Sequence, residues 1–235
     1  MPAGPQDLTM PFPLVLAVLL AVVALGSYAV RAHGRRRRRR SRSRDRALLR
    51  SFRLFIEGAL TPAQLAHAAE SAEEGSYWDA LELLTVKLKR GQWIRVSRAL
   101  AKARHASAER RALSDDSSWR RALAARRLGM LRSRPSWRAL RRAMVKGPEM
   151  VTFAAATSLA RYRDRAAMNW ILTHDVAVAH RHRNALVALF RGFGRGGLPV
   201  LTRGLARGVR SARVELAMID ALGVSAYAPA RMLLE

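Results

Sequence analysis

Apolar side chains after Arg46 recur three and four residues apart, which is the spacing of one face of an α-helix. This region contains no convincing run of alternating apolar and polar residues and no Asn-Gly or Asp-Gly hairpin signal. Its content of alanine and leucine is high. The pattern therefore predicts that everything beyond Arg46 is all-α.

Residues 47–117 are predicted to form a helical amino-terminal region. Its expected helices cover Ala47 to Ala59, a segment that starts at Thr61, Tyr77 to Arg90, and Gln92 to Leu113. Thr61 and Gln64 have the spacing of a capping box, and Pro62 suits the first helical turn. Gly75-Ser76 and Gly91 are expected to separate the helices. The third helix is expected to bury Trp78, Leu81, Leu83, Leu84 and Leu88. The short polar residues Ser114 to Ser118 predict a turn and a helix N-cap before Trp119.

The rest of the chain, residues 118–235, shows internal repetition. Four pairs of apolar residues recur at intervals of 31, 31 and 29 residues: Leu128 and Leu131, Leu159 and Tyr162, Phe190 and Phe193, and Ile219 and Leu222. Each pair ends a helix rich in small residues, and a short turn and a second helix follow. We therefore expect four helix pairs, at about 118–148, 149–177, 178–209 and 210–235.

One such pair cannot bury its apolar stripe alone, so the pairs are expected to stack into an α-solenoid, a curved right-handed superhelix. The alanines should let the first helices of neighbouring pairs approach closely, while leucines and aromatic residues fill the layer between first and second helices. The chain ends inside the fourth pair's second helix. Either this helix, up to Glu235, caps the stack, or another subunit covers it.

The stretch before the helical region has the pattern of a membrane anchor. Residues 10–30 are uncharged and mostly aliphatic, long enough for the roughly 20-residue span that a bilayer core requires. A cleavable signal peptide is the alternative, but it carries its positive charge before the apolar core and ends at a small-residue cleavage site. Here eleven arginines follow the apolar core, between Arg31 and Arg50. We therefore expect a single retained transmembrane helix.

The Arg-rich segment, residues 31–46, predicts orientation and location. Arginine and lysine accumulate on the cytoplasmic side of spans, so the amino terminus should lie outside and the bulk of the chain in the cytoplasm, at a bacterial inner membrane. The segment can act as a stop-transfer signal and also as a patch on anionic lipid headgroups. Its candidate membrane-surface residues are Arg35, Arg36, Arg37, Arg38, Arg39 and Arg40.

Charge and the absence of cysteine narrow the function classes. Residues 51–235 hold 32 basic and 15 acidic side chains, so this part alone carries +17. Such a charge attracts polyanions or acidic protein surfaces. Arginine outnumbers lysine 39 to 4, which we attribute mainly to a GC-rich genome. The lack of cysteine excludes disulfides, thiol catalysis and Cys-ligated metals.

The segment Arg121-x-x-Ala124-Ala125-x-x-Leu128-Gly129-x-Leu131, followed by a turn, Pro135 and Trp137-x-x-Leu140, resembles the short HEAT repeat, in particular the bacterial type related to the phycobilisome-lyase class. The resemblance covers roughly residues 118–235. Arg127 stands where a small residue is usual, and Arg163 and Arg195 lie near turns. The whole layout resembles membrane-anchored bacterial HEAT-repeat proteins. That resemblance implies a protein-binding scaffold, and it suggests a glycosyltransferase as a partner, because some members are encoded beside such enzymes.

The groups that could carry chemistry have simpler interpretations. His174, His180 and His182 lie among arginines, unlike metal ligands. Asp115 and Asp116 fit a helix cap, and the cluster of Glu73, Glu74, Asp79 and Glu82 fits a solvated face. Gly192 to Gly197 lacks the strand and the Lys-Ser/Thr ending of a phosphate loop. We therefore expect no metal, no cofactor and no enzymatic activity.

The leading hypothesis is a membrane-anchored, cytoplasm-facing scaffold that binds an acidic or membrane-associated partner protein. The concave face of the second helices should present the basic binding surface. Its candidate residues are Arg138, Arg141, Arg142, Arg203 and Arg207. The alternative is a basic solenoid that binds an anionic polymer, such as nucleic acid, or an anionic lipid surface. The membrane tether argues against nucleic acid.

Overall fold

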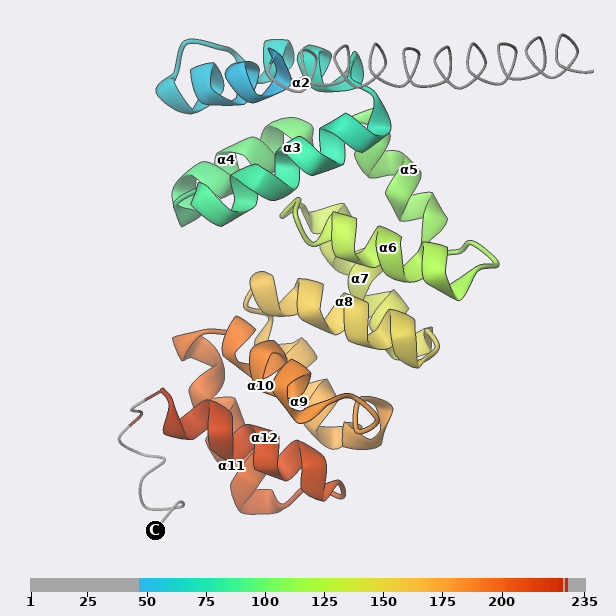
Figure 1. The fold of residues 1–235 in the computed structure, drawn as a ribbon, viewed down its shortest axis with the longest axis vertical. Helices are drawn as coiled ribbons and strands as arrows, with labels where there is room; N and C mark the ends of the chain where they lie inside the picture. The colour runs from blue at the N-terminus through green and yellow to red at the C-terminus, as the bar shows by residue number, and fades with distance from the viewer. Residues whose placement is uncertain (1–46, 226, 228–235) are drawn as a thin grey trace, which may run out of the picture. The chain divides into compact units, whose positions relative to one another are not determined.

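A computed structural model describes residues 47–225 and residue 227 of the chain. In this part every regular element is a helix and no strand occurs, which confirms the all-α prediction (Figure 1). The chain divides into two units, Met1–Ala47 and Leu48–Glu235, and the second unit holds all the labelled helices. The predicted span, residues 10–30, and the Arg-rich segment with Arg35 to Arg40 lie outside the described residues. Within the described part, every helix is too short or too polar to cross a bilayer.

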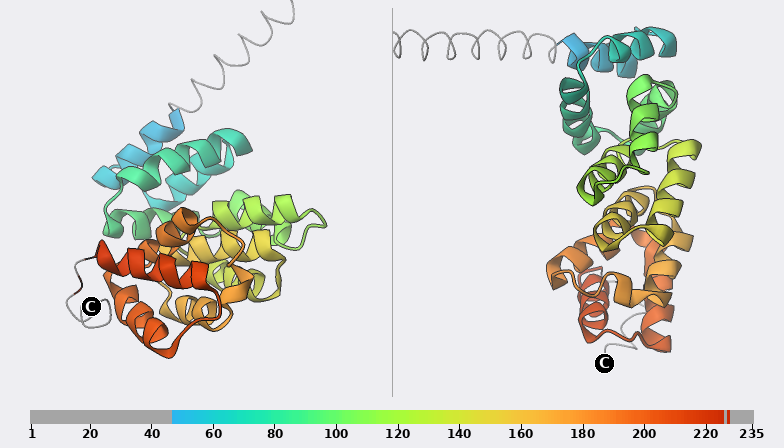
Figure 2. Two further views of the ribbon diagram at one scale, coloured as in Figure 1. Left: turned by 60° about the horizontal axis from the view of Figure 1, so that its bottom comes forward. Right: turned by 90° about the vertical axis from the view of Figure 1, so that its right-hand side faces the viewer.

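The helices follow one another in chain order through the unit (Figures 1 and 2). A first helical segment covers residues 47–57. It is followed by α2 (Pro62–Glu70), α3 (Glu74–Lys87), α4 (Arg90–Leu100), α5 (Arg104–Ala112), α6 (Ser118–Leu128), α7 (Arg134–Lys146), α8 (Glu149–Arg161), α9 (Arg165–Thr173), α10 (Arg183–Gly192), α11 (Leu198–Arg207) and α12 (Ala212–Gly223). Two short 3-10 turns, η1 (Asp175–Ala177) and η2 (Arg195–Gly197), precede α10 and α11.

Two predicted helix starts are confirmed, and in each a side chain caps the first turn. The Thr61 hydroxyl accepts from the backbone N–H of Gln64, and the Gln64 side chain accepts from the N–H of Thr61, which completes the capping box. The Ser117 hydroxyl caps α6 in the same way by accepting from the Arg120 amide. These caps satisfy amides that a helix start otherwise leaves without partners.

Two predicted breaks are wrong. Gly75 and Ser76 lie inside the first turn of α3, because Glu73 adopts the extended N-cap conformation and Glu74 begins the helix. Gly91 lies within α4, which starts earlier because the Gln92 side chain accepts from the backbone N–H of Lys89.

The predicted long helix from Gln92 to Leu113 is two helices, α4 and α5, separated at residues 101–103. Leu83, predicted to be buried, is exposed.

The repeated part contains the expected alternation of helices. α6 and α7, α8 and α9, and α10 and α11 follow one another in the predicted order, α12 begins a fourth pair, and the arrangement is consistent with an α-solenoid. The recurring apolar residues are buried, except that Ile219 is only partly buried. The predicted fourth second helix, with Met232, Leu233 and Glu235, lies outside the described residues.

The first helices of neighbouring pairs approach closely, as the alanines predict. α6 contacts α8, α8 contacts α10, and α10 contacts α12. Ala125, Ala155 and Ala156 are completely buried. At the α6–α8 contact the Ser158 hydroxyl donates to the Ala125 carbonyl at 2.8 Å, and a Cβ atom on Gly129 would lie 2.4 Å from the Ser158 Oγ. Only glycine therefore fits at position 129 without displacing α8.

A buried carboxylate joins the amino-terminal helices to the repeated part. Glu109 of α5 is 1% exposed and accepts at 2.6 Å from both Arg120 and Arg127 of α6. Arg127 also donates to Glu74 of α3 at 2.6 Å, and its guanidinium lies 5.5 Å from the ring centre of Trp78. Arg127, unusual for the repeat it resembles, is thus the residue that links α3, α5 and α6.

We predict that Gly129→Ala lowers the free energy of unfolding by about 1–3 kcal/mol, because the new methyl group overpacks the α6–α8 contact. Gly75→Ala is the control, since a Cβ there meets nothing within 4 Å. It should change stability little, or raise it by about 0.4–1 kcal/mol. Urea denaturation followed by circular dichroism measures both. Equal stability of the two variants would contradict the close approach.

We predict that Glu109→Gln lowers the free energy of unfolding by about 3 kcal/mol, because it leaves two partly buried arginines without their shared carboxylate. Asp79→Asn removes an exposed charge from α3 and should cost less than about 0.5 kcal/mol. Chemical denaturation of the two variants tests the difference. A small effect of Glu109→Gln would show that water replaces the carboxylate without cost.

Candidate functional site: a groove between α6 and α8

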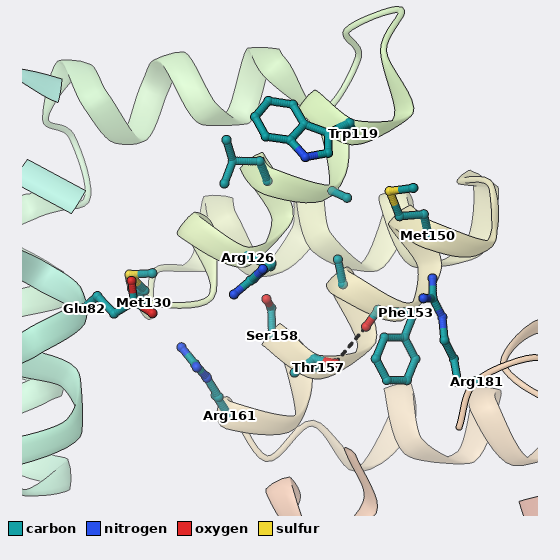
Figure 3. A pocket seen from close by; sticks show the side chains of 13 residues that line it. Glu82, Trp119, Arg126, Met130, Met150, Phe153, Thr157, Ser158, Arg161 and Arg181 are labelled. Atoms are coloured by element: carbon teal, nitrogen blue, oxygen red, sulfur yellow. Dashed lines mark hydrogen bonds between the residues drawn. The ribbon is translucent and has the colours of Figure 1, made fainter. Parts of the chain in front are cut away.

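A groove of about 470 Å³ lies between the first helices α6 and α8 (Figure 3). Most of its lining is apolar, and charged side chains stand at its margins. The lining residues are Glu82, Trp119, Ala122, Leu123, Arg126, Met130, Met150, Phe153, Ala154, Thr157, Ser158, Arg161 and Arg181. The small side chains at positions 122 and 154 leave the hollow that the larger side chains surround.

Helix periodicity directs these side chains into the groove from both sides. On α6, Trp119, Leu123 and Arg126 follow the i, i+4, i+7 spacing of one helix face. On α8, the groove-lining residues recur at three- and four-residue steps from Met150 to Arg161. Ser117 caps α6 two residues before Trp119, and Pro148 occupies the N-cap of α8 two residues before Met150. The two caps therefore place both large apolar side chains in first turns.

The apolar part of the groove is open to solvent. Trp119 is 65% exposed and Met150 is 44% exposed. Phe153 is partly buried, and the Arg181 guanidinium covers its ring at 4.9 Å from the ring centre (Figure 3). An exposed tryptophan beside an exposed methionine is unusual for a surface that stays in water and is typical of a binding surface.

The charges around the groove are predominantly positive. Arg126 and Arg161 are exposed, and within the part of the chain that the structure describes neither forms an ion pair. The Nε atom of Arg181 is buried without a hydrogen-bond partner. Glu82 of α3 is the acidic residue of the lining. The groove is therefore suited to a ligand that is apolar on one side and negatively charged at its edges.

The predicted binding residues lie on second helices, away from this groove. Arg138 and Arg142 on α7 are exposed, whereas Arg141 is partly buried, with its guanidinium 5.0 Å from the ring centre of Trp137 and its Nε 3.7 Å from Asp164. Arg142 lines a depression of about 270 Å³ together with Arg110, Arg121 and Lys146.

Arg203 and Arg207 are exposed on α11 and line a different depression, of about 330 Å³, with Asn169. Arg207 donates to the Asn169 side chain at 3.4 Å. The five predicted arginines thus lie on two different helices, and of the three on α7 Arg142 is the one that lines the depression there. Neither depression exposes an aromatic side chain comparable to Trp119.

Two of the histidines considered for chemistry have structural partners. His174 stacks on Trp170 at 4.5 Å, and His180 lies 3.3 Å from Glu149. In residues 47–225 no group of three or more His, Asp or Glu side chains is arranged to hold a metal ion. Gly194 has φ +64° and leads into η2, so the glycine-rich segment forms the turn before α11.

One feature of the sequence indicates the groove, although it was not among the predicted binding residues. The spacing of Trp119, Leu123 and Arg126 marks one face of α6, but the same face can pack inside a solenoid. What distinguishes the two cases is the position of α3 and α8, which leaves Trp119 uncovered.

Comparison of the chain with protein-family models, with curated proteins and with solved structures finds no match.

We predict that Trp119→Ala and Met150→Ala each change the free energy of unfolding by less than about 0.5 kcal/mol, because exposed side chains contribute little to the core. Leu159→Ala, in the fully buried core of α8, should cost about 2–5 kcal/mol. Urea denaturation of the three variants tests this. If Trp119→Ala costs as much as Leu159→Ala, the tryptophan belongs to the core and is not available for binding.

Proposed function

We propose that this protein is a non-catalytic scaffold that binds an acidic amphipathic helix of a partner protein in the groove between α6 and α8. The exposed Trp119 and Met150, flanked by the unpaired Arg126 and Arg161, are the observation that carries the proposal. Aromatic residues, methionine and arginine are the residue types enriched in protein interfaces.

The shape and chemistry of the groove favour a helix as the bound segment. An amphipathic helix presents apolar residues at i, i+3, i+4 and i+7 to a hydrophobic groove. Such a face would cover Trp119, Leu123 and Phe153 on the two helices that line the groove. Acidic residues at the edges of the same helix would pair with Arg126 and Arg161, which would direct the encounter and fix its orientation.

We further propose that the helix pairs belong to the HEAT-like class and that residues 10–30 anchor them to a membrane. The apolar length of residues 10–30 and the arginines that follow support the anchor. Tethering would confine the scaffold to two dimensions and raise the effective concentration of a membrane-associated partner. The partner is thus expected to be acidic and to work at the cytoplasmic face of an inner membrane.

The experiment compares quantitative affinity purifications of the full-length protein from native membranes. Trp119→Ala and the double variant Arg126→Glu/Arg161→Glu should each lower recovery of the partner by about tenfold or more, as loss of a central interface residue does. The matched control is Arg111→Glu/Arg191→Glu, which reverses two exposed charges outside the groove. In addition, Leu123→p-benzoylphenylalanine should crosslink to an acidic helical segment of that partner.

Two results would contradict the proposal. Undiminished recovery with both groove variants would show that partners bind elsewhere, including the second-helix sites of Arg138, Arg141, Arg142, Arg203 and Arg207. An equal loss with the control variant would show that overall positive charge is what matters. That second result would favour the alternative, in which the basic helices bind an anionic polymer or an anionic lipid surface.

A further inference from the structure

A second cavity lies where the turns between first and second helices meet α4. Its volume is about 830 Å³, and it is open to solvent. The lining comprises Arg90, Ile94, Arg98, Arg132, Ser133, Arg134, Trp137, Tyr162, Arg163, Asp164, Arg165 and Ala166. We call it the turn pocket. It shares no lining residue with the groove between α6 and α8.

Six of the residues that line the turn pocket are arginines, and none of the six forms an ion pair with a carboxylate among the described residues. The acid in the lining, Asp164, is occupied by other groups. Its Oδ1 accepts from the amides of Ala166 and Ala167, and its Oδ2 accepts from the Trp137 indole at 2.7 Å. The pocket is therefore strongly positive.

The environment of Arg132 is electrostatically unfavourable for its charge. Arg132 is partly buried, and burial lowers the pKa of its guanidinium, with the charges of Arg90 and Arg163 lowering it further. Because arginine keeps its proton under ordinary conditions, the lowered pKa reflects a cation held where it is electrostatically destabilised. A bound anion would remove that cost.

Arg163 joins the lining of the turn pocket from the turn that follows α8. Its φ is +58°, and it is the only residue other than glycine with positive φ in residues 47–225. The left-handed conformation is unfavourable for a residue that carries a Cβ atom. The repeat register that aligns Tyr162 with Phe193 aligns Arg163 with Gly194, which has φ +64° without that cost. The conformation belongs to the C-cap of α8, in which the Asp164 amide donates to the Leu159 carbonyl and the Arg163 amide to the Ala160 carbonyl.

The neighbouring turn is shaped to accommodate the arginine side chains. A Cβ atom on Gly194 would lie 3.3 Å from Nε of Arg163, and one on Gly196 would lie 3.3 Å from an Nη of Arg165. The amino-terminal ends of α7 and α9 also adjoin the pocket, where the side chains of Ser133 and Asp164 cap them.

From this geometry we propose that the turn pocket binds a small molecule that carries a diphosphate group. A phosphate monoester carries about −1.5 to −2 charges, fewer than the six cations present, whereas a diphosphate comes closer to balancing them. Arginine is also the residue best suited to pair with phosphate oxygens in a bidentate manner. The partly buried Ile94 and Trp137 provide an apolar edge for the group that carries the diphosphate.

The test is a calorimetric titration of the full-length protein, in neutral detergent, with inorganic pyrophosphate. Sulfate at matched ionic strength corrects for nonspecific binding to the Arg-rich segment. Arg132→Ala and Arg163→Gly should each weaken the saturable binding by about tenfold or more, as loss of a charged hydrogen-bond partner does. The control Arg191→Ala removes an exposed charge of α10 and should leave the affinity unchanged.

A stability measurement separates loss of the site from loss of the fold. Arg163→Gly relieves the left-handed strain, so it should raise the thermal midpoint of the ligand-free protein while it lowers pyrophosphate affinity. Opposite changes of this kind cannot arise from partial unfolding. Wild-type affinity in both pocket variants, an equal loss in Arg191→Ala, or full competition by sulfate would overturn the proposal.

Two further probes distinguish the source of the diphosphate. ADP carries it on a water-soluble nucleoside, and farnesyl diphosphate carries it on a lipid-like chain. Tighter binding of farnesyl diphosphate than of pyrophosphate would assign the pocket to a lipid diphosphate. Tighter binding of ADP would assign it to a soluble nucleotide. In either case Arg132→Ala and Arg163→Gly should weaken the binding, so both results would support the same pocket.

Discussion

The close approach of α6, α8, α10 and α12 is the constraint on which the repeated part of the structure depends. Alanine side chains bring these helices together, and at the α6–α8 contact Gly129 leaves just enough room for Ser158. The Tyr162 hydroxyl adds to this contact by lying within hydrogen-bond distance of the Leu128 and Leu131 carbonyls, 2.7 and 2.5 Å away. The same approach opens the groove, because Ala122 and Ala154 are too small to fill the space between Trp119 and Phe153.

The arginines of this protein fall into two groups with different physical roles. Arg120 and Arg127 share the buried Glu109, so their charges hold α5 and α6 together. The arginines of the groove and of the turn pocket lack such partners among the described residues and retain their attraction for external anions. A uniform excess of positive charge would not separate these roles. The positions of the few carboxylates separate the two roles, because they neutralise some arginines and leave others available to bind anions.

Features of the fold that depend on residues close together in the sequence could be predicted, and features that depend on distant residues could not. Thr61 was identified as a cap from sequence, and a second cap was expected within Ser114 to Ser118, because a cap involves residues three positions apart. Gly75 and Gly91 were misjudged as breaks, because a helix interior tolerates glycine when the extended N-cap lies elsewhere. The separation of α4 from α5 was also missed. Nothing in that alanine-rich stretch marks it, and the turn places Glu109 against two arginines of α6.

The sequence alone therefore determined the class of fold, the succession of helix pairs and the positions of the recurring buried residues, because helical periodicity is a property of neighbouring residues. Only the tertiary structure decided which cations are paired, which tryptophan is exposed and which turns meet at a pocket. Those properties depend on residues far apart in the chain. Arg127 illustrates the difference: it looked like a departure from a repeat pattern, and the fold places it against Glu74 and Glu109.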